Sequence, residues 1–146
     1  MSSKLVFLDR VFGKVDWRDG FINRMTKRGI PAETFFKPVV NDGNMEARHR
    51  EDEAKKNADF VLFYFGDLPQ TDANRVGFYS FLELVIALFN GDLNRGVIVL
   101  DATDIPAPAC EANEEAYKNL KKHFPNSAIF ATLAEAEDWI AKQLAE

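Results

Sequence analysis

The run of residues 60–65, with the sequence FVLFYF, is the feature that most constrains the fold of this chain. A strand with one face in water alternates polar and apolar side chains, whereas a strand inside a parallel sheet is covered on both faces and is apolar throughout. Residues 5–8 and 97–100 are similar short apolar runs. The chain is therefore expected to contain a parallel sheet with helices on both faces.

Segments of helical length alternate with these apolar runs. The pattern predicts helices at about 17–28 (ended by Gly29), 44–57, 80–90, 111–123 and 132–144, and further extended segments at 34–36, 38–40 and 128–130. Pro38 favours an edge strand or a strand exit for the second extended segment.

Five strands that alternate with helices predict a doubly wound α/β fold. Right-handed crossovers make the flavodoxin-like order 2-1-3-4-5 the expected arrangement of its five-stranded parallel sheet. In such a sheet, ligands bind in a crevice at the carboxyl ends of strands one and three, where the loops after the first four strands meet. Functional residues are therefore expected at that edge.

Length and charge narrow the possible classes of protein. Residues 1–146 are expected to form a single domain, because the length suits one core and no linker, repeat or low-complexity tract interrupts the pattern. A net charge of −5 argues against nucleic acid as a partner, since no basic stripe is present to bind phosphates. The longest nearly apolar stretch, residues 76–91, is too short to span a bilayer. With no signal-peptide pattern and one cysteine, the expected compartment is the cytoplasm, away from membranes.

Common cofactor and metal motifs are missing from the sequence. No G-x-G-x-x-G follows the first apolar run and no Walker lysine loop occurs, so a dinucleotide or triphosphate held by either motif is not supported. His49 and His123 stand alone in charged helical segments, and no Cys, His and Asp spacing suggests a metal site. A receiver domain would need an acidic pair at Asp9 and an aspartate in place of Gly66. We therefore expect no cofactor and no metal.

Glu83 is the only charged residue between Arg75 and Asp92, within a helical segment that is otherwise strongly apolar. It shares one small or polar stripe of the predicted helix 80–90 with Ser80. The stripe begins in the first turn, beside the loop after the third strand, so Glu83 is expected at the crevice. The apolar remainder of this helix predicts packing against the sheet and against another subunit, that is, a homo-oligomer.

A purely structural role for Glu83 is the alternative. The segment from Ser80 to Glu83 has the S-x-x-E form of a capping box, in which the serine caps the helix and the glutamate reaches back to the serine N–H. The same pattern occurs at Thr132 and Glu135, where polar neighbours make capping a sufficient explanation. The residues alone leave both interpretations of Glu83 open.

A series of short motifs follows one another along the first two thirds of the chain. They are residues 6–8 leading to Trp17 and Arg18, residues 38–40 with Asp42, residues 50–53 before 58–62, and residues 77–80 followed by Glu83. In order and spacing they resemble the nucleoside 2-deoxyribosyltransferase family, more closely its divergent branch. The last third of the chain is similar only in its alternation of strand and helix.

The resemblance implies a flavodoxin-like fold and cleavage of the N-glycosidic bond of a 2′-deoxynucleoside or its monophosphate. In this family a glutamate early in the helix after the third strand, three residues after a Ser or Thr, is the nucleophile, and Glu83 matches that position. The deoxyribosyl-enzyme ester is then passed to another base or to water. The implied partners are a nucleoside or nucleotide and a free nucleobase.

Three aspartates are candidates for supporting roles. The leaving base needs a proton, and Asp67, just past the third strand, is placed to act as that acid. Asp9 and Asp42 follow the first and second strands and are expected to bind sugar hydroxyls or to orient Glu83. Ordinary turn residues are the alternative for Asp67 and Asp42, since both lie in turn-rich segments.

Three further residues are candidates for lining the substrate pocket: Trp17, Tyr79 and Ser80. Trp17 is alternatively a core or lid residue, and Tyr79 alternatively packs against its neighbours. Arg18 would bind a phosphate if the substrate were a nucleotide, although an exposed ion pair is the simpler expectation.

One position departs from the better-known transferases, which carry an aspartate six residues before the glutamate. Gly77 occupies that position here. The departure favours an alternative function, a non-catalytic module that binds a nucleoside or nucleotide, whereas Glu83 in an apolar helix favours the enzyme. A purely structural oligomer would leave the acids of the loops without a role.

Overall fold

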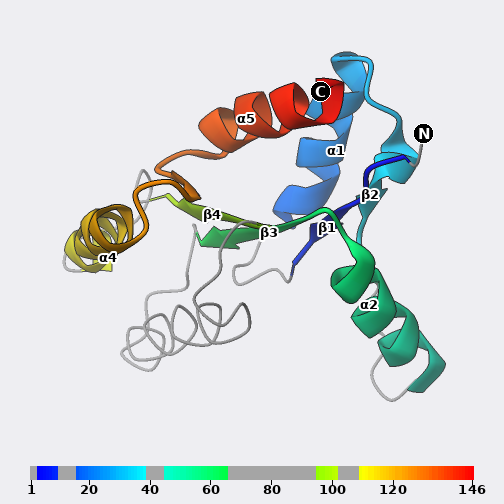
Figure 1. The fold of residues 1–146 in the computed structure, drawn as a ribbon, viewed down its shortest axis with the longest axis horizontal. Helices are drawn as coiled ribbons and strands as arrows, with labels where there is room; N and C mark the ends of the chain where they lie inside the picture. The colour runs from blue at the N-terminus through cyan, green and yellow to red at the C-terminus, as the bar shows by residue number, and fades with distance from the viewer. Residues whose placement is uncertain (1–2, 10–15, 39–44, 66–94, 102–108) are drawn as a thin grey trace.

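The computed structural model describes residues 3–9, 16–38, 45–65, 95–101 and 109–146. In chain order, their elements are β1 (Val6–Leu8), α1 (Trp17–Lys27), a 3-10 turn (Ala32–Thr34), β2 (Phe35–Phe36), α2 (Met45–Asn57), β3 (Phe60–Phe65), β4 (Gly96–Leu100), α4 (Ala109–His123), β5 (Ala128–Phe130) and α5 (Leu133–Ala145). Every helix and strand predicted within these ranges is present (Figure 1).

The strands form one five-stranded parallel sheet in the order β2-β1-β3-β4-β5, which confirms the predicted flavodoxin-like fold class. β1 lies between β2 and β3, with Val6 opposite both Phe35 and Phe60. The chain therefore places β2 on one side of β1 and β3 on the other. The position between β1 and β3, from which the chain continues to opposite sides, is the topological switch point where the crevice of a doubly wound sheet lies.

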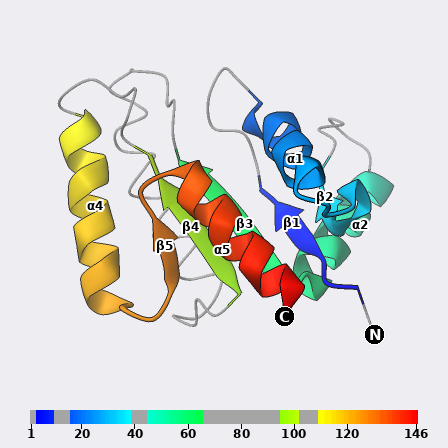
Figure 2. The same cartoon turned by 90° about the horizontal axis from the view of Figure 1, so that it is seen from above.

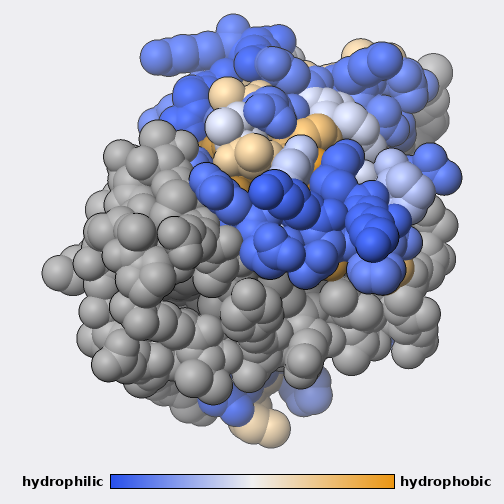
Figure 3. All heavy atoms as spheres, turned by 90° about the vertical axis from the view of Figure 1, so that its left-hand side faces the viewer, coloured by the Kyte–Doolittle hydropathy of each residue, from blue (hydrophilic) through white to orange (hydrophobic). Residues whose placement is uncertain are grey.

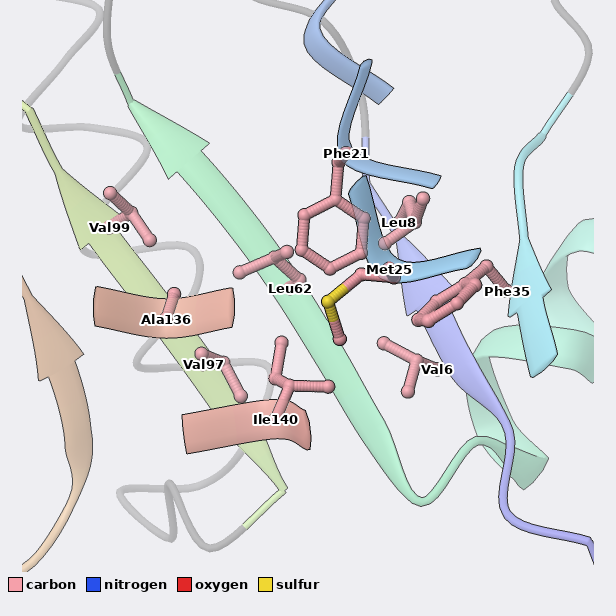
Figure 4. Close-up of a cluster of buried hydrophobic side chains, with 10 residues drawn as sticks. All are labelled: Val6, Leu8, Phe21, Met25, Phe35, Leu62, Val97, Val99, Ala136 and Ile140. Atoms are coloured by element: carbon pink, nitrogen blue, oxygen red, sulfur yellow. The ribbon is translucent and has the colours of Figure 1, made fainter. Parts of the chain in front are cut away.

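Helices cover both faces of this sheet (Figures 1 and 2). On one face, α1 and α5 contribute Phe21, Met25 and Ile140 to a buried cluster with side chains of the strands (Figure 4). On the opposite face, Ala54 of α2 and Leu120 of α4 pack in a second cluster. The two covered faces explain why the central strands are apolar throughout.

β3 shows how one strand serves both clusters. Leu62 belongs to the cluster on the face covered by α1 and α5, called the α1–α5 cluster below. Its neighbours Val61 and Phe63 belong to the cluster on the face covered by α2 and α4, called the α2–α4 cluster. All three side chains are buried, and each contributes about 1.5–3 kcal/mol relative to an exposed position. The continuous apolar run is therefore a requirement of the central position of β3.

α1 ends at the predicted glycine. Gly29 adopts a φ of 85°, and its N–H donates to the Thr26 carbonyl at 2.9 Å. The next N–H, from Ile30, donates to the Met25 carbonyl at 3.2 Å. These bonds satisfy carbonyls that the end of the helix would otherwise leave free.

α5 begins at a side-chain cap and is joined to α1 by an ion pair. The Thr132 hydroxyl accepts a hydrogen bond from the Glu135 N–H at 3.3 Å, which confirms the cap predicted at this position. Arg24 Nε of α1 lies 2.6 Å from Glu137 Oε1 of α5, and Glu137 is buried. Helices far apart in the sequence are thus held side by side.

The far end of the sheet carries α4, whose last turn contains Lys121, Lys122 and His123. Cations suit this end of the helix dipole. The side of the molecule seen in Figure 3 is mainly hydrophilic where its residues are described, with a small apolar area between the polar side chains. None of the helices in the described ranges has the length and apolar character that a membrane span requires.

Candidate functional site

The carboxyl edge of the sheet holds two aspartates that directly follow strands. Asp9 follows β1, and its N–H donates to the Leu62 carbonyl of β3 at 3.0 Å. Asp101 follows β4, and its N–H donates to the Phe65 carbonyl at 3.0 Å. Both aspartates therefore continue the sheet hydrogen bonding, so their backbones are held in place at the edge where ligands bind in this fold.

The alternation of side chains sends these two aspartates to opposite sides of the sheet. Asp9 lies on the side of α2, as does Phe7 two residues before it. Asp101 lies on the side of α1 and α5, where it contacts Tyr64. The described part of the edge thus has two separate polar groups.

The first group is the pair of Asp9 and Lys55. Asp9 is only 5% exposed, and Lys55 Nζ, in the last turn of α2, lies 3.3 Å from its Oδ1. The distance is that of an ion pair, but Oδ1 accepts no aligned hydrogen bond from the described residues. The ammonium also lies 5.2 Å from the centroid of the Phe7 ring, a cation–π contact that helps to place it.

The second group consists of Trp17, Tyr64 and Asp101. The Tyr64 hydroxyl donates to Asp101 Oδ2 at 3.3 Å. The Trp17 ring lies 5.4 Å from the Tyr64 ring, tilted by 44°, and 6.0 Å from the Phe21 ring in an edge-on contact. Trp17 Nε1 is buried and finds no hydrogen-bond partner among the described residues.

These contacts bear on the expectation for Trp17. Its rings pack against Phe21 and Tyr64, residues of the α1–α5 cluster, which is the packing role given above as the alternative to substrate binding. A role in lining the pocket remains a prediction. The polar groups beside its ring that such a role would use are its buried Nε1 donor and the Tyr64 hydroxyl.

Arg18 is buried, not exposed as expected. Its side chain is 5% exposed, and Nε and Nη2 donate to the two carboxylate oxygens of Asp16, each at 3.0 Å. Nη1 donates to the carbonyl of Pro38 at 3.1 Å. The ion pair was predicted correctly, but the burial of Arg18 was not. The guanidinium also contacts Pro38, which follows β2 and is distant from Arg18 in the sequence. With its three nitrogens engaged in this way, Arg18 is poorly placed to bind a phosphate.

Asp16 also caps α1, because Oδ1 accepts the Arg18 N–H at 3.0 Å. The hydrogen bonds from the Arg18 side chain are the main cause that holds the pKa of Asp16 below its ordinary value of 3.8. The backbone N–H bond and the charges of Arg18 and Lys37 act in the same direction, while partial burial opposes them.

Five of the predicted site residues lie outside the described residues: Asp42, Asp67, Tyr79, Ser80 and Glu83. The helix predicted at 80–90, from which a homo-oligomer was expected, lies outside them as well. Of the predicted site residues, the structure therefore describes Asp9 and Trp17, and it places them in the two different groups of the edge.

The described residues contain no group of three or more His, Cys, Asp or Glu side chains that could hold a metal ion. His49 and His123 are both exposed on their helices. The described groups of the edge are suited instead to hydrogen bonding and charge pairing, through two carboxylates, a tyrosine hydroxyl and an ammonium group.

Lys55 and Tyr64 are edge residues that the sequence did not single out. The spacing of Lys55 to Glu51 suggests a pair along the helix, whereas the structure pairs its ammonium with Asp9 of another element. No local pattern reports such a contact. Tyr64 had a signal that could have been used, because it carries the only hydroxyl of the 60–65 run, one residue before the strand ends.

No family model matches the chain, and no curated protein matches it. A functional proposal therefore rests on the chemistry of the edge residues and on the order of the sequence motifs.

Proposed function

We propose that the protein cleaves the N-glycosidic bond of 2′-deoxynucleosides or their monophosphates through a deoxyribosyl ester on Glu83. The sugar is then transferred to another nucleobase or to water. The proposal makes the protein a nucleoside 2-deoxyribosyltransferase or a related nucleoside N-glycosidase.

The observation that carries the proposal is the strand order. β1 and β3 are neighbours whose carboxyl ends face the same edge of the sheet, and Asp9 lies beside β3, with its N–H bonded to the carbonyl of Leu62, three residues before β3 ends at Phe65. The motif of residues 77–80 and Glu83 follows β3 in the sequence, as in the family that the chain resembles. A sheet of this order supports the proposal because its ligands bind beside these strand ends.

The proposed reaction has two displacement steps. The Glu83 carboxylate bonds to C1′ while the bond from C1′ to the base nitrogen breaks, and that nitrogen takes a proton from the Asp67 carboxyl group. A nitrogen of a second base, or water, then bonds to C1′ as the bond to Glu83 breaks, which releases the Glu83 carboxylate, and the proton lost by the incoming nitrogen or water returns to the Asp67 carboxylate. Positive charge develops on the sugar in both steps, and a nearby carboxylate stabilises it.

The described edge residues suit the binding of a nucleoside. A sugar hydroxyl needs a hydrogen-bond acceptor, and Asp9 supplies a carboxylate at the end of β1. A base needs an aromatic surface and polar partners, and Trp17 and Tyr64 supply rings, an indole N–H and a hydroxyl. In this proposal Asp42, Tyr79 and Ser80 complete the pocket.

The proposal is tested by incubating the protein with each 2′-deoxynucleoside and each monophosphate, with and without a second free base. The products are then separated and measured by chromatography. Wild type should release or exchange the base, and Glu83→Gln should lower the rate by at least about a thousandfold, since the nucleophile is lost. Glu135→Gln is the matched control, because Glu135 holds the same position in the capped turn of α5. Equal rates for wild type and Glu83→Gln would contradict the proposal and leave Glu83 as a capping residue.

The second candidate is a non-catalytic module that binds the same ligands. Gly77 favours it, because the better-known transferases carry an aspartate there. Thermal stabilisation of the wild type by a nucleoside or nucleotide, without any turnover, would support this candidate over the enzyme.

A homo-oligomer in the cytoplasm belongs to the proposal as well. The apolar sequence of residues 80–90 favours packing against a second copy of the chain. Light scattering of the purified protein measures this directly, and a monomeric mass would contradict it.

A further inference from the structure

Lys55 is set apart from the other cations of α2 by its contacts. Its ammonium lies 3.3 Å from Asp9 Oδ1 and over the ring of Phe7, and its side chain is 28% exposed. The next residue, Lys56, is exposed on the same last turn. The stem of Lys55 thus lies along the sheet, and its charge ends at the edge where β1 stops.

The Asp16–Arg18 and Asp9–Lys55 ion pairs differ in kind. Asp16 is 37% exposed and accepts two side-chain hydrogen bonds from Arg18, so both of its carboxylate oxygens have a partner. The Asp9 side chain is only 8% exposed, and among the described residues its one charged partner is the Lys55 ammonium, which is not aligned as a hydrogen bond with Oδ1. A carboxylate that is more buried and less satisfied is costly unless it has a further partner.

A lysine suits the role of balancing such a carboxylate. An arginine fork binds both carboxylate oxygens and leaves little room for another donor, whereas an ammonium is a compact charge that occupies one side. The pairing therefore balances the charge of Asp9 and leaves acceptor capacity on its carboxylate. A hydroxyl group at the crevice is a donor of the right kind.

We infer that Lys55 is a positioning residue of the nucleoside site, which orients the Asp9 carboxylate so that it accepts a hydrogen bond from a sugar hydroxyl of the bound nucleoside. The inference rests on the proposed function and adds a residue to it. Without the ammonium, Asp9 is a buried carboxylate that has lost the charge balancing it among the described residues, and it turns towards water and away from the ligand.

Steady-state kinetics with hydroxyl-deleted substrates tests this inference. The wild type is compared on a 2′-deoxynucleoside and on its 2′,3′-dideoxy and 2′,5′-dideoxy analogues. One of the analogues should have a kcat/KM lower by at least about tenfold, because the unpaired Asp9 disfavours it. Lys55→Met keeps the length of the stem and removes the charge; it should raise KM for the 2′-deoxynucleoside by about tenfold and bring the ratio between substrate and analogue close to one.

Four further variants make the test specific. Lys56→Met removes the same charge one residue away and should leave both KM and the ratio at wild-type values. Lys55→Arg keeps a cation and should restore most of the ratio. Asp9→Asn should reproduce Lys55→Met, and the Lys55→Met/Asp9→Asn double variant should be no worse than Asp9→Asn alone, since Lys55 acts through Asp9. The double variant buries no unbalanced charge, so it serves even if Lys55→Met fails to fold.

The outcomes separate this inference from the proposed function. If the wild type turns over substrate but Lys55→Met and Lys56→Met have equal KM values and equal substrate ratios, the role of Lys55 is overturned and the proposed function is not. Additive losses in the double variant would lead to the same conclusion. Absence of turnover and of binding by the wild type would overturn the proposed function and, with it, the inference.

Discussion

At the scale of single residues, the start of α1 is the best-defined polar contact of the described chain. Asp16 caps the helix and holds the guanidinium of Arg18, which is 5% exposed and reaches the carbonyl of Pro38. A charge this buried is acceptable because its hydrogen bonds are made. The pair therefore ties the segment after β2 to the beginning of α1.

Asp16→Asn should make the stability of the protein less dependent on pH. The folded-state pKa of Asp16 lies below the unfolded value of 3.8, so its ionised form stabilises the fold above about pH 4, and this stabilisation is lost as the pH falls through the folded-state pKa. Asn can still cap the helix but cannot ionise. In urea unfolding at a series of pH values, wild type should be the more stable protein near neutral pH, and the difference should close in acid.

The control for this prediction is Asp19→Asn, in the same turn of α1. Asp19 is 67% exposed and pairs with Lys37 Nζ at 2.6 Å, an arrangement worth at most about 1 kcal/mol. A stability difference for Asp16→Asn that stays constant from neutral pH into acid would show that its charge has no part in the effect.

Arg18→Lys should destabilise the fold although the charge is kept. A lysine cannot bind both oxygens of Asp16 and also reach the Pro38 carbonyl, so buried acceptors lose their donors. We expect a loss of about 1–2 kcal/mol in the free energy of unfolding, measured by urea denaturation. No change in the urea midpoint would mean that the fork geometry is unimportant here.

At the scale of elements, the ends of helices are where sequence and structure agree most closely. The predicted helix 132–144 is Leu133–Ala145 in the structure, capped by Thr132 as expected. The predicted strand 97–100 is Gly96–Leu100. Caps and strand patterns depend on neighbouring residues, so they can be read locally. Of the expected extended segment 34–36, β2 contains Phe35–Phe36, and the expected segment 38–40 continues beyond the described residues.

Two glycines of α1 should respond in opposite directions to alanine. Gly29→Ala places a Cβ at a φ of +85°, which costs about 1 kcal/mol although no atom lies within 4 Å of it. Gly20→Ala lies inside the helix, where alanine is favoured by about 0.8–1.0 kcal/mol and the new Cβ meets only the flexible end of Arg24 at 3.0 Å. Thermal unfolding should therefore show a lower Tm for the first variant and a higher Tm for the second. Shifts of the same sign would contradict this account.

At the scale of the whole molecule, the sheet separates two cores. Ile140 lies in the α1–α5 cluster and Ile129 in the α2–α4 cluster, and both are buried. The two clusters share no buried residue among those described, because successive side chains of each strand point to opposite faces. Each face therefore contributes its own part of the stability.

Ile129→Val and Ile140→Val should act independently. Each removes one buried methylene and is expected to cost about 0.5–1.5 kcal/mol. Because the two residues belong to clusters that share no buried residue among those described, the double variant should lose the sum within about 0.5 kcal/mol. Urea unfolding of the four proteins measures this, and a clear deviation from the sum would show that strain passes through the sheet.

The candidate site could be predicted only in part, because local sequence patterns do not show contacts between residues of different elements. Asp9 was found because it directly follows an apolar run, and the strand order then places it beside β3, where its N–H bonds to the carbonyl of Leu62. Lys55 was not found, because its helical spacing points to Glu51 and its actual partner lies on another element. The burial of Arg18 was missed for the same reason, since Pro38 is distant in the sequence.

Within the described residues, the sequence by itself determined which segments are strands and helices, where α1 ends and α5 begins, and the order of the parallel sheet. Those features follow from periodicity, local capping and the handedness of crossovers, which act between neighbours or apply to every chain. Only the tertiary structure decided which charges meet at the carboxyl edge, as in the Asp9–Lys55 and Tyr64–Asp101 contacts. Such contacts depend on how the packed elements are placed relative to one another. That packing is driven by the burial of apolar side chains, so the local sequence around each polar residue does not show which polar partner it will meet.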